Sequence, residues 1–333
     1  MKKIKVLDCT LRDGGYINDW NFGFDNINSI IKSLDIAKID FIECGFLKNI
    51  QTSKDYTVFN NINDIKQIKT TNAIKTFMIN NGEYDYSEII KNDLTNFAFR
   101  IAFRIEYLSE VCDFAKILKD KGAKVFINPK NFSTFSEKEI TILINKINNL
   151  SPFAFSIVDT LGAMSKDNLQ EKSQLINNLN KNIALCFHSH NNLSLSMENT
   201  IEFIKLYSDY NLIIDSSIGG IGRGAGNLST EYICKYLNEN YKSKYNIDEI
   251  NKVKENIIEK FFMKISDKNM ELYYLTAKMN CHPNYATFLI KNNIKSIDLA
   301  KELFDLLPKN KKTFYEEKTI NKLYMKLLIN KAK

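Results

Sequence analysis

Two of the three histidines in this chain of 333 residues, His188 and His190, flank a single serine. They follow an apolar run, residues 183–187, that predicts a β-strand. Side chains two residues apart on a strand point to the same face, so both imidazoles should project side by side where the strand ends. Such a pair can bind a divalent metal, although a solvated strand end explains the pair alone equally well.

The composition is that of an ordinary globular protein, with 44% hydrophobic and 26% charged residues and a net charge of +7. The lysines are interspersed with Asp and Glu, which argues against a nucleic-acid partner and is compatible with an acidic small-molecule substrate. No apolar run is long enough for a bilayer, and the first residues lack a secretory h-region, so we expect a cytoplasmic protein without membrane contact. Six scattered cysteines predict reduced, buried thiols.

Eight apolar, β-rich runs recur at even spacing, and segments with helical periodicity separate them. The runs cover residues 4–9, 39–44, 74–79, 97–103, 123–127, 153–158, 183–188 and 212–216. The helical segments carry terminal signals: Asp25 as an expected N-cap, Gly122 as an expected C-terminus, and a capping box of Ser136 and Glu139.

Eight strand–helix units predict an α/β fold, a (β/α)8 TIM barrel, over residues 1–243. A doubly wound open sheet is the competing interpretation, but no GxGxxG follows the first strand. From residue 244 to 333 the strand pattern stops, and we expect a C-terminal helical region near the mouth of the barrel.

Enzymes with this fold place their chemistry at the C-terminal ends of the strands, and ionisable residues gather there in this sequence. A catalytic metal takes about three protein ligands, so the two histidines need a carboxylate. Asp13 is the first choice, because strands one and seven are close neighbours across a closed barrel; Asp8 and Asp215 are alternatives. Two imidazoles and a carboxylate suit Mn²⁺, Mg²⁺, Co²⁺ or Zn²⁺.

Arg12 precedes Asp13 and would add a fixed positive charge beside such a metal. A 2-oxo acid can chelate a metal, and both cations would then stabilise the charge that moves onto its keto oxygen in an enolate. A purely structural role for Arg12, an ion pair with Asp13 or Glu43, stays open.

Three separated motifs resemble the DRE-TIM metallolyase superfamily, also called HMGL-like. They are Asp-Cys-Thr-Leu-Arg-Asp-Gly at 8–14, His-Ser-His at 188–190 and Gly-Ala-Gly-Asn at 224–227. Residues 190–196 are most similar to the pyruvate-specific class II aldolases, the 4-hydroxy-2-oxovalerate aldolases. The resemblance spans residues 3–240 and continues more weakly to 285–289.

The resemblance implies that Asp13, His188 and His190 bind the metal, with Mn²⁺ as the first choice, and that Asp13 and His188 also border the substrate. It assigns stabilisation of a pyruvate enolate to Arg12 and a pairing with that arginine to Glu43.

Three further residues match family positions. Thr160 stands where the family has a serine that contacts substrate, and Tyr285 matches a tyrosine that reaches in from the C-terminal region. Asn227 matches a residue at or near the metal, although a helix N-cap would suit it equally well.

Two positions depart from the aldolase pattern. Tyr16 stands where the aldolases have a histidine base, and a tyrosine hydroxyl is a weak base near neutral pH. The base is therefore either Tyr16, acting through a water, or His282, which could equally be a surface histidine. Arg223 lies in a glycine loop where small residues are expected, and it could bind a substrate carboxylate or phosphate or simply solvate the loop.

The leading hypothesis is a metal-dependent carbon–carbon lyase that cleaves a 4-hydroxy-2-oxo acid to pyruvate and an aldehyde, or condenses them. A Claisen-type acyl-CoA lyase or synthase and a non-catalytic binding barrel are the alternatives. By resemblance, we expect a homo-oligomer, and an acylating aldehyde dehydrogenase is a candidate partner.

Overall fold

The eight predicted strands form one closed parallel barrel. In this computed structural model, which describes residues 3–87, 89–261 and 267–331, β1 pairs with both β9 and β2 and so closes the sheet. The barrel strands are β1 (Ile4–Asp8), β2 (Phe41–Leu47), β4 (Ile74–Asn80), β5 (Phe97–Phe103), β6 (Lys124–Pro129), β7 (Ala154–Asp159), β8 (Ala184–Ser189) and β9 (Leu212–Ser216). A two-residue strand, β3 (Val58–Phe59), pairs with the end of β2. The TIM-barrel prediction is confirmed.

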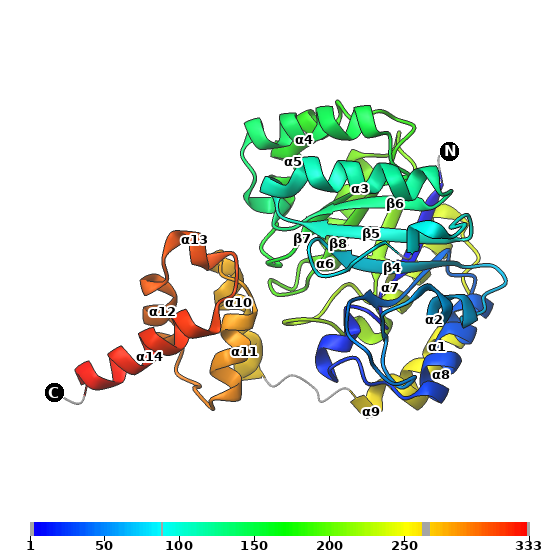
Figure 1. Cartoon of the computed structure of the whole chain (residues 1–333). Helices are drawn as coiled ribbons and strands as arrows, with labels where there is room; N and C mark the ends of the chain where they lie inside the picture. The colour runs from blue at the N-terminus through cyan, green and yellow to red at the C-terminus, as the bar shows by residue number, and fades with distance from the viewer. Residues whose placement is uncertain (1–2, 88, 262–266, 332–333) are drawn as a thin grey trace.

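Helices surround the barrel and continue into the C-terminal region (Figure 1). Around the barrel lie α1 (Phe24–Ile36), α2 (Ile62–Gln67), α3 (Leu108–Asp120), α4 (Glu137–Leu150), α5 (Lys166–Ile176), α6 (Ser196–Leu206), α7 (Thr230–Tyr241), α8 (Ile247–Val253) and α9 (Glu259–Phe261). The C-terminal region holds α10 (Asp267–Lys278), α11 (Asn284–Lys291), α12 (Ile297–Leu306), α13 (Lys309–Lys312) and α14 (Glu317–Lys331).

The ends of α1 and α4 test the predicted helix signals. The capping box of Ser136 and Glu139 opens α4 as predicted. The predicted cap at Asp25 is wrong: Gly23 precedes α1, and Asp25 lies within its first turn. The backbone enters this helix from a left-handed glycine at φ 81°, two residues before the position at which Asp25 would be the N-cap. In the first turn the Asp25 carboxylate still interacts favourably with the helix dipole.

The inside of the barrel is layered, because side chains alternate along each strand. One layer is apolar and includes Phe41, Ala98, Phe126, Ala154, Cys186 and Ile213. Two residues further along the same strands come Glu43, Arg100, Asn128, Ser156, His188 and Asp215, all buried. A polar layer therefore lies between the hydrophobic layer and the C-terminal ends of the strands, which form the mouth of the barrel.

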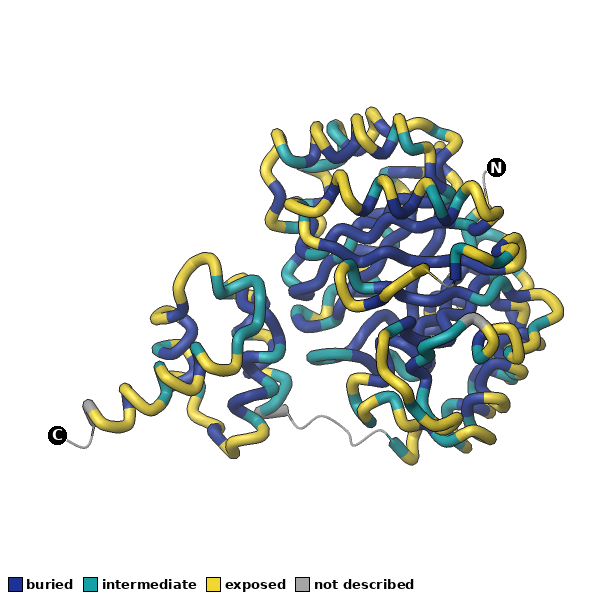
Figure 2. Tube along the Cα trace, in the orientation of Figure 1, coloured by how far each residue is buried: buried dark blue, intermediate teal, exposed yellow. Residues whose placement is uncertain are grey.

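The C-terminal helices have an apolar cluster of their own, which spans Leu272 to Leu327, and they lie beside the loops that follow the barrel strands (Figures 1 and 2). Hydrophobic residues from Tyr245 to Ile258 instead pack with the cluster around the barrel. The division at residue 243 stays a prediction, and its outer ends, residues 1–2 and 332–333, lie outside the described residues.

Two simpler expectations concern thiols and membranes. All six cysteines are free, and five of them are buried. Among the described residues no helix is both long and apolar enough to cross a membrane.

Candidate active site

Asp13, His188 and His190 converge at the mouth of the barrel. Each offers one ligand atom, these atoms lie within 4.8 Å of one another, and all three residues are buried. Asp13 is held by the turn after β1, where the amides of residues 12, 13 and 14 all donate to the carbonyl of Cys9. Two imidazoles and one carboxylate at this spacing fit a divalent metal with open positions for a substrate.

The two imidazoles are oriented through their Nδ1 atoms. His188 Nδ1 donates to Asp215 Oδ2 at 2.9 Å, and His190 Nδ1 donates to the carbonyl of Gly226 at 3.3 Å. In this tautomer each Nε2 keeps a lone pair, as metal-binding histidines require. Burial is the main cause that lowers the pKa of His190 to about 3, so this imidazole is neutral.

Neither alternative carboxylate joins this group in the described part of the chain. Asp215 acts as the hydrogen-bond partner that orients His188. Asp8 accepts bonds from the amide of Thr10 and the hydroxyl of Thr230, and burial raises its pKa to about 6.

Asn227 lies against Asp13 rather than at the start of a helix. Its amide donates to Asp13 Oδ2 at 2.8 Å, while its Oδ1 is buried without a partner among the described residues. Ser229 is the N-cap of α7, so the helix-cap interpretation of Asn227 is wrong. An orphaned oxygen beside Asp13 is a further observation that fits a cation at this place. A Cβ at Gly222 would come 2.3 Å from the Asn227 amide nitrogen, so this approach requires glycine.

A chain of buried charges supports the metal ligands from below. Arg12 Nε donates to Glu43 at 2.8 Å, Arg100 donates to the same Glu43 oxygen at 3.1 Å, and Arg100 also donates to Asp215. Because Asp215 holds His188, the chain of charges runs from the arginine beside Asp13 to an imidazole on β8, which only β9 separates from β1. Burial opposes ionisation of Asp215, but Arg100 and His188 outweigh it and lower its pKa to about 2.

Arg12 also contacts Asp13 directly, at 2.5 Å through Nη1. Burial acts to lower the pKa of Arg12, but Glu43 and Asp13 raise it well above its usual value. Burial acts to raise the pKa of Asp13, and Arg12 with both histidines holds it well below its usual range. Within the described residues the third nitrogen of Arg12, Nη2, has no hydrogen bond, and it can donate to a ligand.

A cavity of about 370 Å³ opens above these groups. We call its strand-end part, lined by Arg12, Asp13, Thr160, His188 and His190, the inner half. The outer half is lined by Arg104, Lys130, Arg223, His282, Thr313, Phe314 and Tyr315. Thr160 lies in the wall, where its hydroxyl accepts the amide of Asn131 at 2.9 Å.

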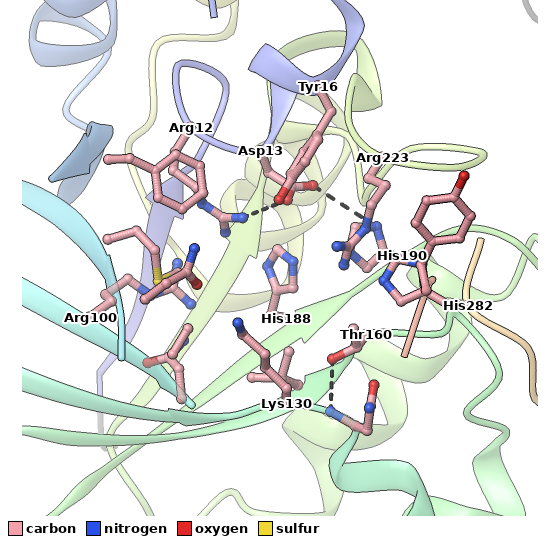
Figure 3. Close-up of a pocket in the computed structure, with 18 of the residues that line it drawn as sticks. Arg12, Asp13, Tyr16, Arg100, Lys130, Thr160, His188, His190, Arg223 and His282 are labelled. Carbon is pink, nitrogen blue, oxygen red and sulfur yellow. Dashed lines mark hydrogen bonds and ion pairs between the residues drawn. The ribbon is translucent and has the colours of Figure 1, made fainter. Parts of the chain in front are cut away.

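The two candidate bases line the cavity in different ways (Figure 3). Tyr16 is about a third exposed; it lines the cavity with Arg12 and Asp13, and its ring lies 5.2 Å from the guanidinium of Arg223. His282 is buried beside His190 and Arg223, and burial first, then these neighbours, hold its pKa well below its usual range. Its Nδ1 accepts the amide of Asn284 at 3.2 Å, so the neutral ring carries its proton on Nε2 and is a donor there.

Tyr285 is not among the residues that line the cavity. It is fully buried, and its hydroxyl donates to the carbonyl of Lys311 at 2.8 Å. The segment that it holds, residues 311–316, brings Phe314 and Tyr315 into the wall. Tyr315 therefore reaches the cavity from the region where the resemblance places Tyr285.

Sequence reasoning missed Arg100 and Lys130. Arg100 is the one charged residue in the run 97–103, two positions after the inward-facing Ala98, and this spacing could have identified it. Lys130 directly follows β6, at the end of the barrel where the site is expected.

Comparisons with known proteins agree with this geometry. The HMGL-like family model matches residues 94–257, which include both histidines and Asn227. The matched residues make up just under half of the chain, and this part is similar to the HMGL-like family. Proteins of this family are lyases and aldolases, and enzymes of the superfamily use a divalent metal, so the DRE-TIM and carbon–carbon lyase predictions are confirmed.

The relatives of this chain differ in their activities. It is 24% identical to an oxaloacetate decarboxylase of Mycobacterium tuberculosis, over 70% of this chain and 69% of the relative. It is 25% identical to a 4-hydroxy-2-oxovalerate aldolase of Pelotomaculum thermopropionicum, over 71% of this chain and 70% of the relative. The N-terminal domain of a putative aldolase from Bacteroides vulgatus shares the fold, with a TM-score of 0.72, 24% identity and coverage of 89% and 99%.

Proposed function

We propose that the chain is a divalent-metal-dependent aldolase that forms or breaks the C3–C4 bond of a 4-hydroxy-2-oxo acid through a pyruvate enolate. The observation that carries this proposal is the convergence of Asp13, His188 and His190 beside Arg12 at the barrel mouth. When bound there, a divalent cation, with Mn²⁺ as the first choice, supplies Lewis-acid polarisation of a 2-oxo acid.

The chain's own residues position the substrate and stabilise the charge that develops on it. Arg12, fixed by Glu43 and Asp13, presents Nη2 to the oxygen on which negative charge develops. In the cleavage direction the C4 hydroxyl loses a proton, the C3–C4 bond breaks to release the aldehyde, and C3 is then protonated to give pyruvate. No redox partner is required.

Tyr16 is the better candidate for transfer of the hydroxyl proton. His282 has its Nδ1 lone pair occupied by the Asn284 amide, and its Nε2 already carries the proton. Tyr16 lines the same cavity as Arg12 and Asp13 and is partly open to solvent, so a water can connect its hydroxyl with the substrate.

A second candidate is decarboxylation of a 2-oxo acid with a carboxylate on C3, such as oxaloacetate. It uses the same enolate and needs no base for a hydroxyl, which suits a site that has Tyr16 where the aldolases have a histidine. A Claisen reaction on an acyl-CoA remains the third. Oligomeric state and a dehydrogenase partner remain predictions.

Exchange of the C3 protons of pyruvate in D₂O, followed by NMR, tests the shared enolate step without knowledge of the aldehyde. We expect exchange with Mn²⁺ or Mg²⁺ and none after chelation. Absence of exchange with any metal would overturn the proposal. Release of CO₂ from oxaloacetate, compared with aldehyde release, separates the first two candidates.

A further inference from the structure

The outer half of the cavity holds more positive charge than the chain itself compensates. Arg104, Lys130 and Arg223 all line it, and none of them makes an ion pair within the described residues. The neighbouring Lys48 is paired with Glu83 at 3.3 Å, so it adds no net charge.

The inner half is balanced in a different way. Arg12 and Arg100 face three carboxylates, Asp13, Glu43 and Asp215, which leaves one net negative charge. A divalent metal would convert this to one positive charge, and the carboxylate of a 2-oxo acid would neutralise it. The three outer cations are then still without a partner.

Two of the three outer cations contact aromatic rings, and one of these, Arg104, is exposed to solvent. The guanidinium of Arg104 stacks on Phe314 at 4.1 Å, and that of Arg223 lies 5.2 Å from the ring of Tyr16. The Nε of Arg223 is buried and has no acceptor among the described residues. A buried donor without an acceptor is costly, and an anion in the cavity would satisfy it.

Lys130 is the centre of this group. Burial is the main cause that lowers its pKa to about 8; among its charged neighbours Glu83 raises this pKa, and Arg223, Arg104 and Lys48 lower it. Arg223 and Arg104 therefore lie close enough to Lys130 to affect its charge, as a site in which all three bind a single anion requires.

We propose that the outer half of the cavity binds a second anionic group, a carboxylate or a phosphate, on the aldehyde that the enzyme adds to pyruvate or releases. This inference rests on the proposed function and names the class of its acceptor. An apolar acceptor would leave the buried Nε of Arg223 without an acceptor and Lys130 without an anionic partner from the substrate.

The test compares acceptors that differ only by charge in condensation with pyruvate. 4-Oxobutanoate is set against butanal for a carboxylate, and glyceraldehyde 3-phosphate against glyceraldehyde for a phosphate. In the wild-type enzyme we expect kcat/KM to favour at least one charged acceptor by about 10-fold or more, as charge-assisted hydrogen bonds predict. The preferred pair identifies the anion.

Two variants locate the effect. Lys130→Gln should reduce the charged-to-neutral ratio about 10-fold. Lys124→Gln is the matched control, since it removes the same charge from the opposite end of the same strand, β6, and should keep the ratio. Equal use of charged and neutral acceptors, or an unchanged ratio in Lys130→Gln, would overturn the inference while pyruvate exchange still supported the aldolase.

A binding measurement tests the anion site even if the proposed aldolase function is wrong. If the wild-type protein exchanges no pyruvate protons, the proposed function fails, and calorimetric titration of the metal-loaded protein with inorganic phosphate then tests the anion site. Weaker binding in Lys130→Gln, by about 10-fold, supports the site. An identical affinity in wild type and Lys130→Gln contradicts it.

Discussion

The two halves of the cavity are built on opposite principles. In the inner half each charged side chain contacts an opposite charge, and the side chains come from strands or from the turns directly after them. In the outer half Arg104, Lys130 and Arg223 have no ion pair with any residue that the structure describes, and part of the wall comes from residues 313–315, far along the chain.

This difference separates chemistry from recognition. A site for a developing charge must be oriented before the reaction, and a rigid barrel with a paired polar layer supplies that orientation. Loops and appended segments can vary without disturbing the barrel, so they are suited to select the acceptor. The comparison predicts large effects on turnover from inner residues and smaller, acceptor-dependent effects from outer ones.

The largest effect is expected from Asp13→Asn. The variant loses one of three ligands and the partner of Arg12, so pyruvate exchange should fall on the order of 10³-fold, together with bound metal. Elemental analysis and NMR exchange measure both. Asp8→Asn, on the preceding strand, should keep its metal, because Asp8 bonds to Thr10 and Thr230 instead. Full metal content in Asp13→Asn would refute the ligand assignment.

Arg100→Met tests the buried charges directly. The change leaves Glu43 and Asp215 without their shared partner, and breaking buried ion pairs costs about 3–5 kcal/mol in the free energy of unfolding. Exchange should also slow by about 10–100-fold, because His188 loses its orienting network. Urea denaturation and NMR exchange report the two effects.

Arg104→Met is the matched change in the outer half. It removes a cation–π contact with Phe314, worth about 0.5–1 kcal/mol at an exposed site. Similar unfolding energies for the Arg100 and Arg104 variants would show that the two halves do not differ as we describe.

The sequence predicted the inner half better than the outer half for physical reasons. Buried parallel strands are continuous apolar runs, so their positions, and hence Asp13, His188 and His190 at their ends, follow from local pattern. Sequence analysis missed the role of Arg100 because its partner Asp215 is 115 positions away, and no local periodicity indicates that pairing.

The outer half depends on how distant segments meet. Lys130 becomes a site residue through neighbours from four other loops, and Tyr285 is replaced at the wall by Tyr315 because residues 311–316 fold back over it. Helical periodicity predicts that these segments are helices, but it does not specify where they dock.

The charge of Lys130 predicts a pH dependence confined to charged acceptors. Its ammonium form is present below about pH 8 and is lost as the pH rises through that value, while Glu83, Arg223, Arg104 and Lys48 surround it. The KM for 4-oxobutanoate should therefore rise up to about 10-fold between pH 7 and pH 9. The KM for butanal serves as the reference, and a parallel rise for both acceptors would contradict the role of Lys130.

The smallest effect on the use of acceptors is expected from Tyr285→Phe. Its hydroxyl bonds to the carbonyls of Lys311 and Phe314, so its loss should lower the free energy of unfolding by about 1 kcal/mol. Because the hydroxyl holds the segment rather than facing the cavity, KM for a charged acceptor should rise by no more than about 3-fold. A direct contact with the substrate, as the family resemblance implies, would instead lower kcat by about 10-fold or more without loss of stability. Denaturation and steady-state kinetics of this one variant therefore show whether Tyr285 holds the segment that lines the outer half or contacts the substrate itself.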